Sequence, residues 1–344
     1  MIEYMLQSPG NVVEAEKEIQ EPKNKDVLVK VKTVGVCGSD IHLYHGTYNA
    51  PHSYPMLFGH EWSGVVEKIG ENVTKVKVGD IVTGDCSKYC GVCENCQKDL
   101  NLCGHIEKFG ITIDGASAEY IIRDEMYLYT APKDADVKLV GLSEPIAVAA
   151  HLIQKINKVS DGELKEKNIL VMGGGVIGMS AMLLLKNIYN CDNVSLYDLS
   201  EYRKKTAEKL GAIIPDDKDL EVNTDEKDYS SLYSAAKYDV IIETTGVPRV
   251  FDNSISLLKP MGILGSVGMA LRVEFAQKQI VTKSLTIVGS IGGSGDFGTA
   301  IRLIEEYPEK VQCLISHYFP ISEVKEAFET ASDAEKSMKV VLTV

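Results

Sequence analysis

Four cysteines in one short stretch offer enough sulfur ligands for a metal ion. They are Cys90, Cys93, Cys96 and Cys103. Four thiolates from a single loop can complete the tetrahedral shell of a zinc ion, and a shell without an open position is typical of structural sites, which contribute to folding. We therefore expect a structural zinc in a lobe of about residues 86–103. Cys86, just upstream of the four, is a spare thiol.

A second set of metal-ligating residues is dispersed along the chain. Its members are Cys37, His60, Glu61 and, much later, Glu144. Mixed sulfur, nitrogen and oxygen ligands from separate elements are typical of a catalytic zinc that keeps one position for water or substrate. Taken singly, each residue also has a plain structural interpretation: a buried thiol, a core histidine, a surface charge or, for Glu144 before Pro145, a helix cap. The four residues occur together with the nucleotide-binding motif described next, and this combination favours a metal site over the structural interpretations.

Three glycines form a further pattern, the spacing G-x-G-x-x-G. They are Gly173, Gly175 and Gly178, with Val176 and Ile177 between the last two. Alone, this spacing also occurs in ordinary glycine-rich turns. Here it follows a short apolar strand and opens an apolar helix, which is the context in which a pyrophosphate binds at a helix N-terminus. We therefore expect these five residues to contact a dinucleotide cofactor.

Asp198 stands at the end of the next expected strand, where a carboxylate can bind the ribose hydroxyls of the cofactor. At close range it would repel a 2′-phosphate by up to about 4 kcal/mol, so the sequence predicts NAD rather than NADP. Arg203 could cover the adenine or could only solvate its helix. Val267 and Ser290, near the ends of later strands, are further expected cofactor contacts.

The elements that position these residues change character along the chain. Short strands with turn residues between them, such as the alternating valines at 27–31, predict an antiparallel β domain over the first 130 residues. From about residue 142, strands alternate with helices, which predicts a parallel, doubly wound sheet. The other expected elements are strands at 65–70, 78–82, 169–172, 194–198, 238–243, 262–267, 285–289 and 340–344, helices from 176, over 201–210, from 299 and over 322–331, and a loop or frayed helix at 216–228.

The fold class is therefore α/β, in two domains, since 344 residues exceed what one hydrophobic core usually supports. We expect a first domain over residues 1–140 and a nucleotide-binding domain over 141–289. Residues 290–344 are too few for a third domain, and we expect them to return to the first and pack on it.

The composition argues against several classes of partner. Thirty-six Lys and Arg against 49 Asp and Glu leave a net charge of −13, which repels nucleic acid and anionic membranes. No apolar run is long enough to span a membrane, and the N-terminus lacks a secretory signal pattern. We therefore expect a cytoplasmic protein with reduced thiols that acts on a small molecule.

Taken together, these motifs make the chain resemble the zinc-containing medium-chain dehydrogenase superfamily, and within it the sorbitol and polyol dehydrogenase branch with its threonine dehydrogenase relatives. The resemblance rests on the following motifs: Cys-Gly-Ser-Asp-x-His at 37–42, Gly-His-Glu-x-x-Gly at 59–64, Gly-Asp at 79–80, the cysteine lobe, Glu-Pro at 144–145, the glycine loop and Asp198. The resemblance covers the whole chain. It implies a GroES-like catalytic domain and a Rossmann domain with the active site between them, two zinc ions and NAD as cofactors, and a homotetramer or homodimer.

The resemblance also implies roles for single residues. Cys37, His60 and Glu61 would hold the catalytic zinc, Glu144 would bind it directly or through water, and Asp40 would orient a metal-bound histidine. The chain departs from the family in two places. One residue fewer than usual precedes the last lobe cysteine, so that Cys86 could replace it, and the Arg-Tyr pair that sorbitol dehydrogenases have near the substrate is missing around 289–294, which argues against sorbitol itself.

The implied reaction is the reversible oxidation of a secondary alcohol, such as a polyol, sugar alcohol or sugar alcohol phosphate, to the ketone, with hydride transfer to NAD. Zinc can lower the pKa of a coordinated hydroxyl, and Ser39 and His42 offer a path for the released proton, with Glu61 completing the catalytic set. L-Threonine 3-dehydrogenase and 2,3-butanediol dehydrogenase are alternative activities. The negative charge argues against a zinc-ribbon nucleic-acid binder, and a zinc-free quinone reductase would have no use for Cys37, His60 and the cysteine lobe.

Overall fold

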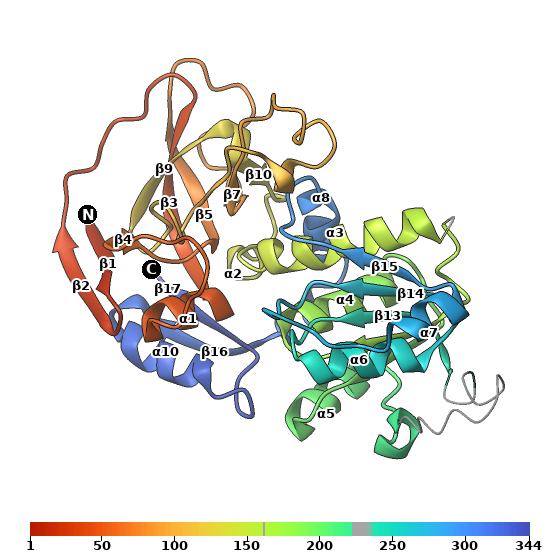
Figure 1. Cartoon of the computed structure of the whole chain (residues 1–344). Coiled ribbons are helices and arrows are strands. Elements are labelled where there is room, and N and C mark those ends of the chain that lie inside the picture. Colours follow the sequence, from red (N-terminus) through yellow and green to blue (C-terminus); the bar gives the residue numbers. More distant parts are fainter. Residues whose placement is uncertain (161, 222–232, 234–235) are drawn as a thin grey trace. The chain divides into compact units, whose positions relative to one another are not determined.

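The computed structural model describes residues 1–160, 162–221, 233 and 236–344 (Figure 1). The chain forms two compact units. Unit 1 contains Met1–Ala147 together with Gly292–Val344, and unit 2 contains Val148–Ile291. Helix α3 (Ser143–Val159) begins in unit 1 and continues into unit 2.

The main sheet of unit 1 is built around the long strand β3 (Asp26–Val36). Among the described residues, seven strands form this sheet, in the order β10-β6-β5-β3-β17-β16, with β9 also paired to β3. Only β16 and β17 pair in parallel. The alternating valines of β3 at 27, 29 and 31 are buried, as a period of two predicts. The other strands are β5 (Glu61–Ile69), β6 (Ile81–Gly84), β9 (Tyr120–Asp124), β10 (Leu128–Thr130), β16 (Ile315–Pro320) and β17 (Lys339–Thr343).

Smaller elements complete unit 1 (Figure 1). Helix α10 packs against α1 through Phe328, whose ring stacks on Tyr44 with centroids 4.6 Å apart, so the C-terminal segment of unit 1 contacts its N-terminal part. The strands are β1 (Ile2–Ser8), β2 (Asn11–Glu16), β4 (Met56–Leu57), β7 (Ser87–Lys88) and β8 (Glu107–Lys108). The helices are α1 (Gly38–His45), α2 (Val137–Val140), α8 (Phe297–Glu306), α9 (Pro308–Gln312) and α10 (Val324–Ser332).

Unit 2 contains a sheet whose described strands all run parallel, in the order β12-β11-β13-β14-β15. The central strands are mostly apolar and buried, because helices cover a parallel sheet, whereas β15 at one edge is largely exposed. They are β11 (Asn168–Met172), β12 (Asn193–Tyr197), β13 (Tyr238–Glu243), β14 (Leu258–Ser266) and β15 (Thr286–Gly289). The connecting helices are α4 (Val176–Asn187), α5 (Glu201–Lys209), α6 (Pro248–Leu257) and α7 (Gln277–Lys283).

The fold class expected from the sequence is confirmed. The expected elements differ from the structure mainly at their ends, whereas helices such as α1 and α6 were not expected individually. Strand β14 begins at Leu258 rather than at 262, because Pro260 and Gly262 resemble a turn in the sequence. Strand β6 begins only at Ile81, since the residues before it form a turn. Of the segment 216–228, Asp217–Leu220 forms a 3-10 helix, and residues 222–228 lie outside the described part of the chain.

In the described part of the chain, no helix combines the length and apolar character that crossing a bilayer requires.

Candidate active site and metal centres

The four cysteines of the lobe lie together with the spacing of a metal site. The Sγ–Sγ distances are 3.5 Å for Cys93 and Cys96, 3.7 Å for Cys90 and Cys103, and 3.9 Å for Cys90 and Cys96. A tetrahedron of sulfurs around zinc at 2.3 Å has edges of about 3.8 Å. The donor chemistry and the spacing of this cluster therefore fit a closed zinc site.

The backbone of the lobe stabilises negative sulfur. The N–H groups of Cys90 and His105 each donate to Cys103 Sγ at 3.3 Å. Hydrogen bonds from the backbone of Gly104 and Cys96 lower the pKa of Cys93 to about 6. Cys103, and not Cys86, completes the cluster, although the shortened spacing left that choice open in the sequence.

Strand pairing brings Cys37, His60 and Glu61 together. Cys37 follows the end of β3 and is the N-cap of α1, while His60 and Glu61 stand at the start of β5, where Glu61 pairs with Gly35 of β3. One donor atom from each of the three lies within 4.8 Å of the others. Gly35 is required here, because a Cβ at this position would collide with the Glu61 carboxylate.

Asp40 lies beneath this group and fixes two of its backbone segments. Its carboxylate accepts the N–H of Cys37 at 2.9 Å and that of Gly59 at 3.2 Å. Its Oδ1 is 3.8 Å from Nδ1 of His60, which is too long for a hydrogen bond, and this Nδ1 has no hydrogen-bond partner in the described part of the chain. Asp40 therefore lies next to the His60 ring, and its role in orienting this histidine stays a prediction.

A second group of donors faces His60. Cys86 Sγ, a Glu144 carboxylate oxygen and a His60 ring nitrogen lie within 4.8 Å of one another, and all three residues are buried. Cys86 follows β6, and Glu144 lies in the first turn of α3. His60 therefore belongs to two donor groups, with Cys37 and Glu61 in one and Cys86 and Glu144 in the other.

The electrostatics of these groups fit a bound cation. Burial raises the pKa of Cys86 to about 12 and that of Glu144 to about 7. Burial alone would lower the pKa of His60, but the charges of Cys86, Asp40 and Cys37 raise it well above its ordinary value. A divalent ion would stabilise the ionised donors, and sulfur, imidazole and carboxylate are the ligands of open zinc sites.

The structure does not join the two residues expected to relay a proton. The Ser39 hydroxyl has no hydrogen-bond partner among the described residues. The exposed His42 ring instead contacts Thr47, with 2.9 Å between Nδ1 and Oγ1. Both residues lie on α1, directly after Cys37. The relay thus stays a prediction.

The expected cofactor residues of unit 2 gather at one edge of the parallel sheet. The glycine loop follows β11, Asp198 follows β12, and Val267 and Ser290 follow β14 and β15. These are the carboxyl ends of the strands, which meet at a single edge. Because the chain leaves β11 toward β12 on one side and β13 lies on the other, this edge is a topological switch point, where such sheets bind ligands.

The glycine loop has the close packing that a pyrophosphate site requires. Gly175 is the N-cap of α4, and Val176 and Ile177 begin that helix, so its first N–H groups point toward the loop. Gly178 permits the approach of loop and helix, because a Cβ there would collide with the carbonyl oxygen of Gly173. The loop therefore fits a dinucleotide phosphate.

Asp198 is held in place by the backbone. Its carboxylate accepts the N–H of Gly174 at 2.6 Å and that of Ser200 at 2.8 Å, and Arg203 lies 3.6 Å from it. A carboxylate has about four acceptor sites, so two remain for ribose hydroxyls. A hollow of about 410 Å³ continues along the edge past β13 and β14, lined in part by Gly246, Ser266 and Gly268.

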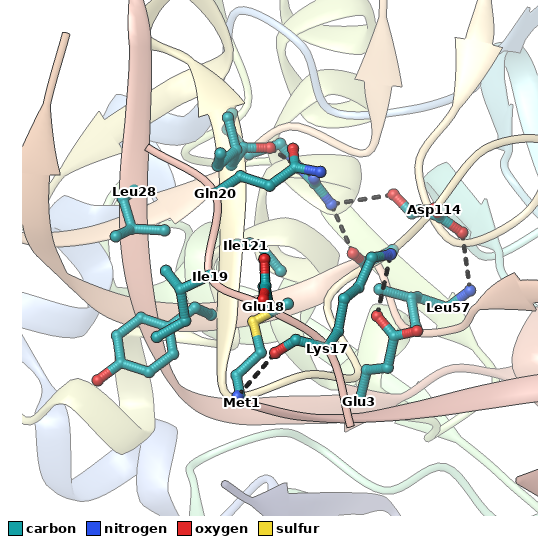
Figure 2. A pocket seen from close by; sticks show the side chains of 14 residues that line it. Met1, Glu3, Lys17, Glu18, Ile19, Gln20, Leu28, Leu57, Asp114 and Ile121 are labelled. Carbon is teal, nitrogen blue, oxygen red and sulfur yellow. Dashed lines mark hydrogen bonds and ion pairs between the residues drawn. The ribbon is translucent and has the colours of Figure 1, made fainter. Parts of the chain in front are cut away.

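A separate hollow of unit 1, of about 610 Å³, lies beside the N-terminus (Figure 2). None of the residues expected to bind metal or cofactor lines it. Two of its polar side chains form hydrogen bonds with backbone groups. Arg123 donates to the carbonyl oxygens of Asp114 and Gly115, and Asp114 accepts the N–H of Leu57 at 3.0 Å. These bonds support the segment that leads to His60.

Comparison with known proteins agrees with this arrangement. Residues 23–133 match the alcohol dehydrogenase GroES-like domain, and residues 137–344 match the glucose dehydrogenase C-terminus. The sorbitol dehydrogenase of Halalkalibacterium halodurans is 32% identical over 97% of this chain and 96% of its own length. The D-arabitol-phosphate dehydrogenase of Enterococcus avium is 30% identical over 98% of this chain and 95% of its own length.

The chain belongs to the zinc-containing medium-chain alcohol dehydrogenase superfamily. A crystal structure of the alcohol dehydrogenase RspB of Escherichia coli CFT073, complexed with NADH, has a TM-score of 0.87 and 28% identity, covering 100% of this chain and 99% of that one. The protein is therefore an oxidoreductase of the alcohol and polyol dehydrogenase type.

The sequence did not predict the surroundings of two residues of this dehydrogenase. One is Cys86, which lies beside His60 and not in the lobe. The other is Lys339, the first residue of β17, whose Nζ lies 2.5 Å from Glu61 Oε2 and donates to the Val36 carbonyl oxygen at 2.9 Å. The sequence signal that could have indicated a buried charge was a lysine at the start of an otherwise apolar strand.

Lys339 and Glu61 form a buried ion pair, with side chains 2% and 1% exposed. Burial alone would lower the pKa of Lys339, but the Glu61 carboxylate raises it. The pair is possible because β17 and β5 flank β3 on either side. It compensates the charge of Glu61 within the protein.

We predict that Lys339→Met lowers the free energy of unfolding by about 3–5 kcal/mol, because it leaves the Glu61 carboxylate buried without a partner. Chemical denaturation followed by tryptophan fluorescence measures this directly, since Trp62 is the only tryptophan and lies buried beside Glu61. Lys336→Met is the matched control, because its ion pair with Asp333 is exposed and should contribute at most about 1 kcal/mol. Equal effects of both substitutions would contradict this role of the buried pair.

Proposed function

We propose that this dehydrogenase is zinc-dependent and NAD-linked, and that it oxidises a secondary alcohol, a polyol, sugar alcohol or sugar alcohol phosphate, reversibly to the ketone. The observation that carries the proposal is the group of buried metal-ligating side chains around His60, in a chain that also holds a dinucleotide-binding edge. The similarity to a sorbitol and an arabitol-phosphate dehydrogenase supports the substrate class.

Cys37, His60 and Glu61 would hold the catalytic ion, with Glu144 as a further donor, directly or through water. Bound there, zinc supplies a Lewis acid that lowers the pKa of a substrate hydroxyl. Asp40 orients His60, and the apolar core around the donors excludes water. Ser39 and His42 are proposed to carry the released proton from the hydroxyl side to solvent, since His42 is exposed.

The cofactor residues have separate tasks in this proposal. The N–H groups at the start of α4 bind the pyrophosphate, and Asp198 accepts from the ribose hydroxyls. Val267 and Ser290 follow neighbouring strands and line the same edge. The four lobe cysteines hold a second, structural zinc. The proposed domains are a GroES-like catalytic domain over 1–140, a Rossmann domain over 141–289 and a return segment over 290–344.

The proposal extends to the state of the protein in the cell. We propose a cytoplasmic homotetramer or homodimer that binds neither nucleic acid nor membrane. The net charge of −13 and the eight free cysteines support the compartment and the absence of anionic partners. The superfamily membership supports the oligomer.

The function is tested with a substrate panel. Purified protein is assayed with NAD⁺ against polyols, sugar alcohol phosphates, 2,3-butanediol and L-threonine, and NADH formation is followed by absorbance. We expect the highest kcat/KM for a polyol, sugar alcohol or sugar alcohol phosphate. A clear preference for threonine or butanediol would replace the substrate class, and no activity with any of these alcohols would refute the proposal.

We predict two zinc ions per chain, because the two donor sets are independent. Cys93→Ser should reduce the zinc content to one and lower the melting temperature, since a closed site is part of the fold. Cys37→Ser should also leave one zinc, but in the lobe, and should abolish activity. Elemental analysis and thermal denaturation check both variants. A Cys93→Ser protein that keeps two zinc ions would show that the lobe is not a metal site.

We predict that kcat/KM with NAD⁺ exceeds that with NADP⁺ by at least about tenfold, equivalent to roughly 1.4 kcal/mol, because Asp198 repels the 2′-phosphate. Asp198→Ala should reduce this ratio. Glu201→Ala is the matched control, since it removes an exposed carboxylate from the same helix region without touching the glycine loop. Equal use of both cofactors by the unmodified enzyme would overturn the argument.

A further inference from the structure

Cys86 lies at the catalytic centre without a role in the proposed function. Its Sγ is grouped with a ring nitrogen of His60 and an oxygen of Glu144, all within 4.8 Å of one another. The three side chains are more than nine-tenths buried. Nδ1 of His60 lies 3.8 Å from Oδ1 of Asp40 and has no hydrogen-bond partner among the described residues, so the protein alone does not satisfy the polar atoms of this ring.

The position of Cys86 is set by the backbone on both sides of it. The Cys86 carbonyl oxygen accepts the N–H of Phe109 at 2.9 Å. The preceding residue, Asp85, accepts from the N–H of Ser87 at 2.8 Å and from the hydroxyl of Ser294 at 2.9 Å. These hydrogen bonds hold the segment that follows β6 in place. They therefore keep the Cys86 thiol close to His60 and Glu144.

Charge compensation differs between the two sides of His60. Glu61 on one side already has Lys339 at 2.5 Å, so its negative charge is balanced within the protein. On the other side, no lysine or arginine forms an ion pair with the Glu144 carboxylate among the residues that the structure describes, and the charge of Lys108 acts on Cys86 and Glu144 only from beyond ion-pair distance. A cation at this centre is therefore drawn toward Cys86 and Glu144, and a soft thiolate is a strong zinc ligand.

We propose that Cys86 is a second sulfur ligand of the catalytic ion, alongside Cys37 and His60. Glu144 and Glu61 then compete for the remaining position, with Glu61 the weaker donor because of its ion pair. This inference rests on the proposed function, since it concerns the same ion. It adds a sulfur to the donor set and assigns a role to the thiol that the cysteine lobe does not use.

The number of sulfur ligands can be measured by replacing the catalytic zinc with Co²⁺ while the lobe keeps its zinc, as verified by elemental analysis. Each thiolate adds intensity to the sulfur-to-cobalt charge-transfer absorption. We expect Cys86→Ser to lower this absorption by about half, because one of two thiolates is lost. Cys191→Ser, which removes a buried thiol of unit 2, should leave it unchanged.

X-ray absorption of the unmodified Co²⁺ protein gives the sulfur count without any substitution, so the test does not depend on the folding of a variant. Two sulfurs at the cobalt support the proposal, and one sulfur overturns it. If Cys86→Ser keeps the full absorption while Cys37→Ser loses the ion, the inference fails and the proposed function stands. If Cys37→Ser leaves metal binding unchanged, the catalytic site of the proposed function is itself wrong.

Discussion

Burial of negative charge around one imidazole is the constraint on which unit 1 depends. Cys37, Glu61, Cys86 and Glu144 all bring acidic groups to His60, in a region from which the hydrophobic core excludes water. Isolated charges are unfavourable in such surroundings unless they are paired. One lysine compensates one carboxylate, and the remaining donors fit a metal ion. Compensation of these buried negative charges therefore matters both for the chemistry of an alcohol dehydrogenase and for the stability of its fold.

The end of strand β3 is where the backbone meets this requirement. Its neighbours β5 and β17 place Glu61 and Lys339 on either side of it, and Gly35 leaves the space in which the carboxylate fits. Because β17 comes from the C-terminal segment, the buried Glu61–Lys339 ion pair forms only when that segment has returned to the sheet. The packing of α10 on α1 also fixes this C-terminal segment against the N-terminal part of unit 1.

The two groups of metal-ligating side chain types differ in how they are built. The lobe cysteines belong to one loop, so local backbone N–H groups can orient them and a closed shell results. The donors around His60 come from the ends of β3 and β6, the start of β5 and the first turn of α3. The sheet edge of unit 2 is built in a third way. The residues expected to bind the cofactor meet there because parallel strands end at a common edge.

The sequence by itself determined the features whose parts are local: the cysteine lobe, the glycine loop with Asp198, the α/β class and most strands of the parallel sheet. Their signals are short spacings and regular periods, which do not depend on distant pairing. Only the tertiary structure decided that Cys86 faces His60 instead of joining the lobe, and that Lys339 compensates Glu61. The physical reason is that these contacts depend on how β6 and β17 pair with strands far away in the chain, and strand register is set by the packing of the whole sheet.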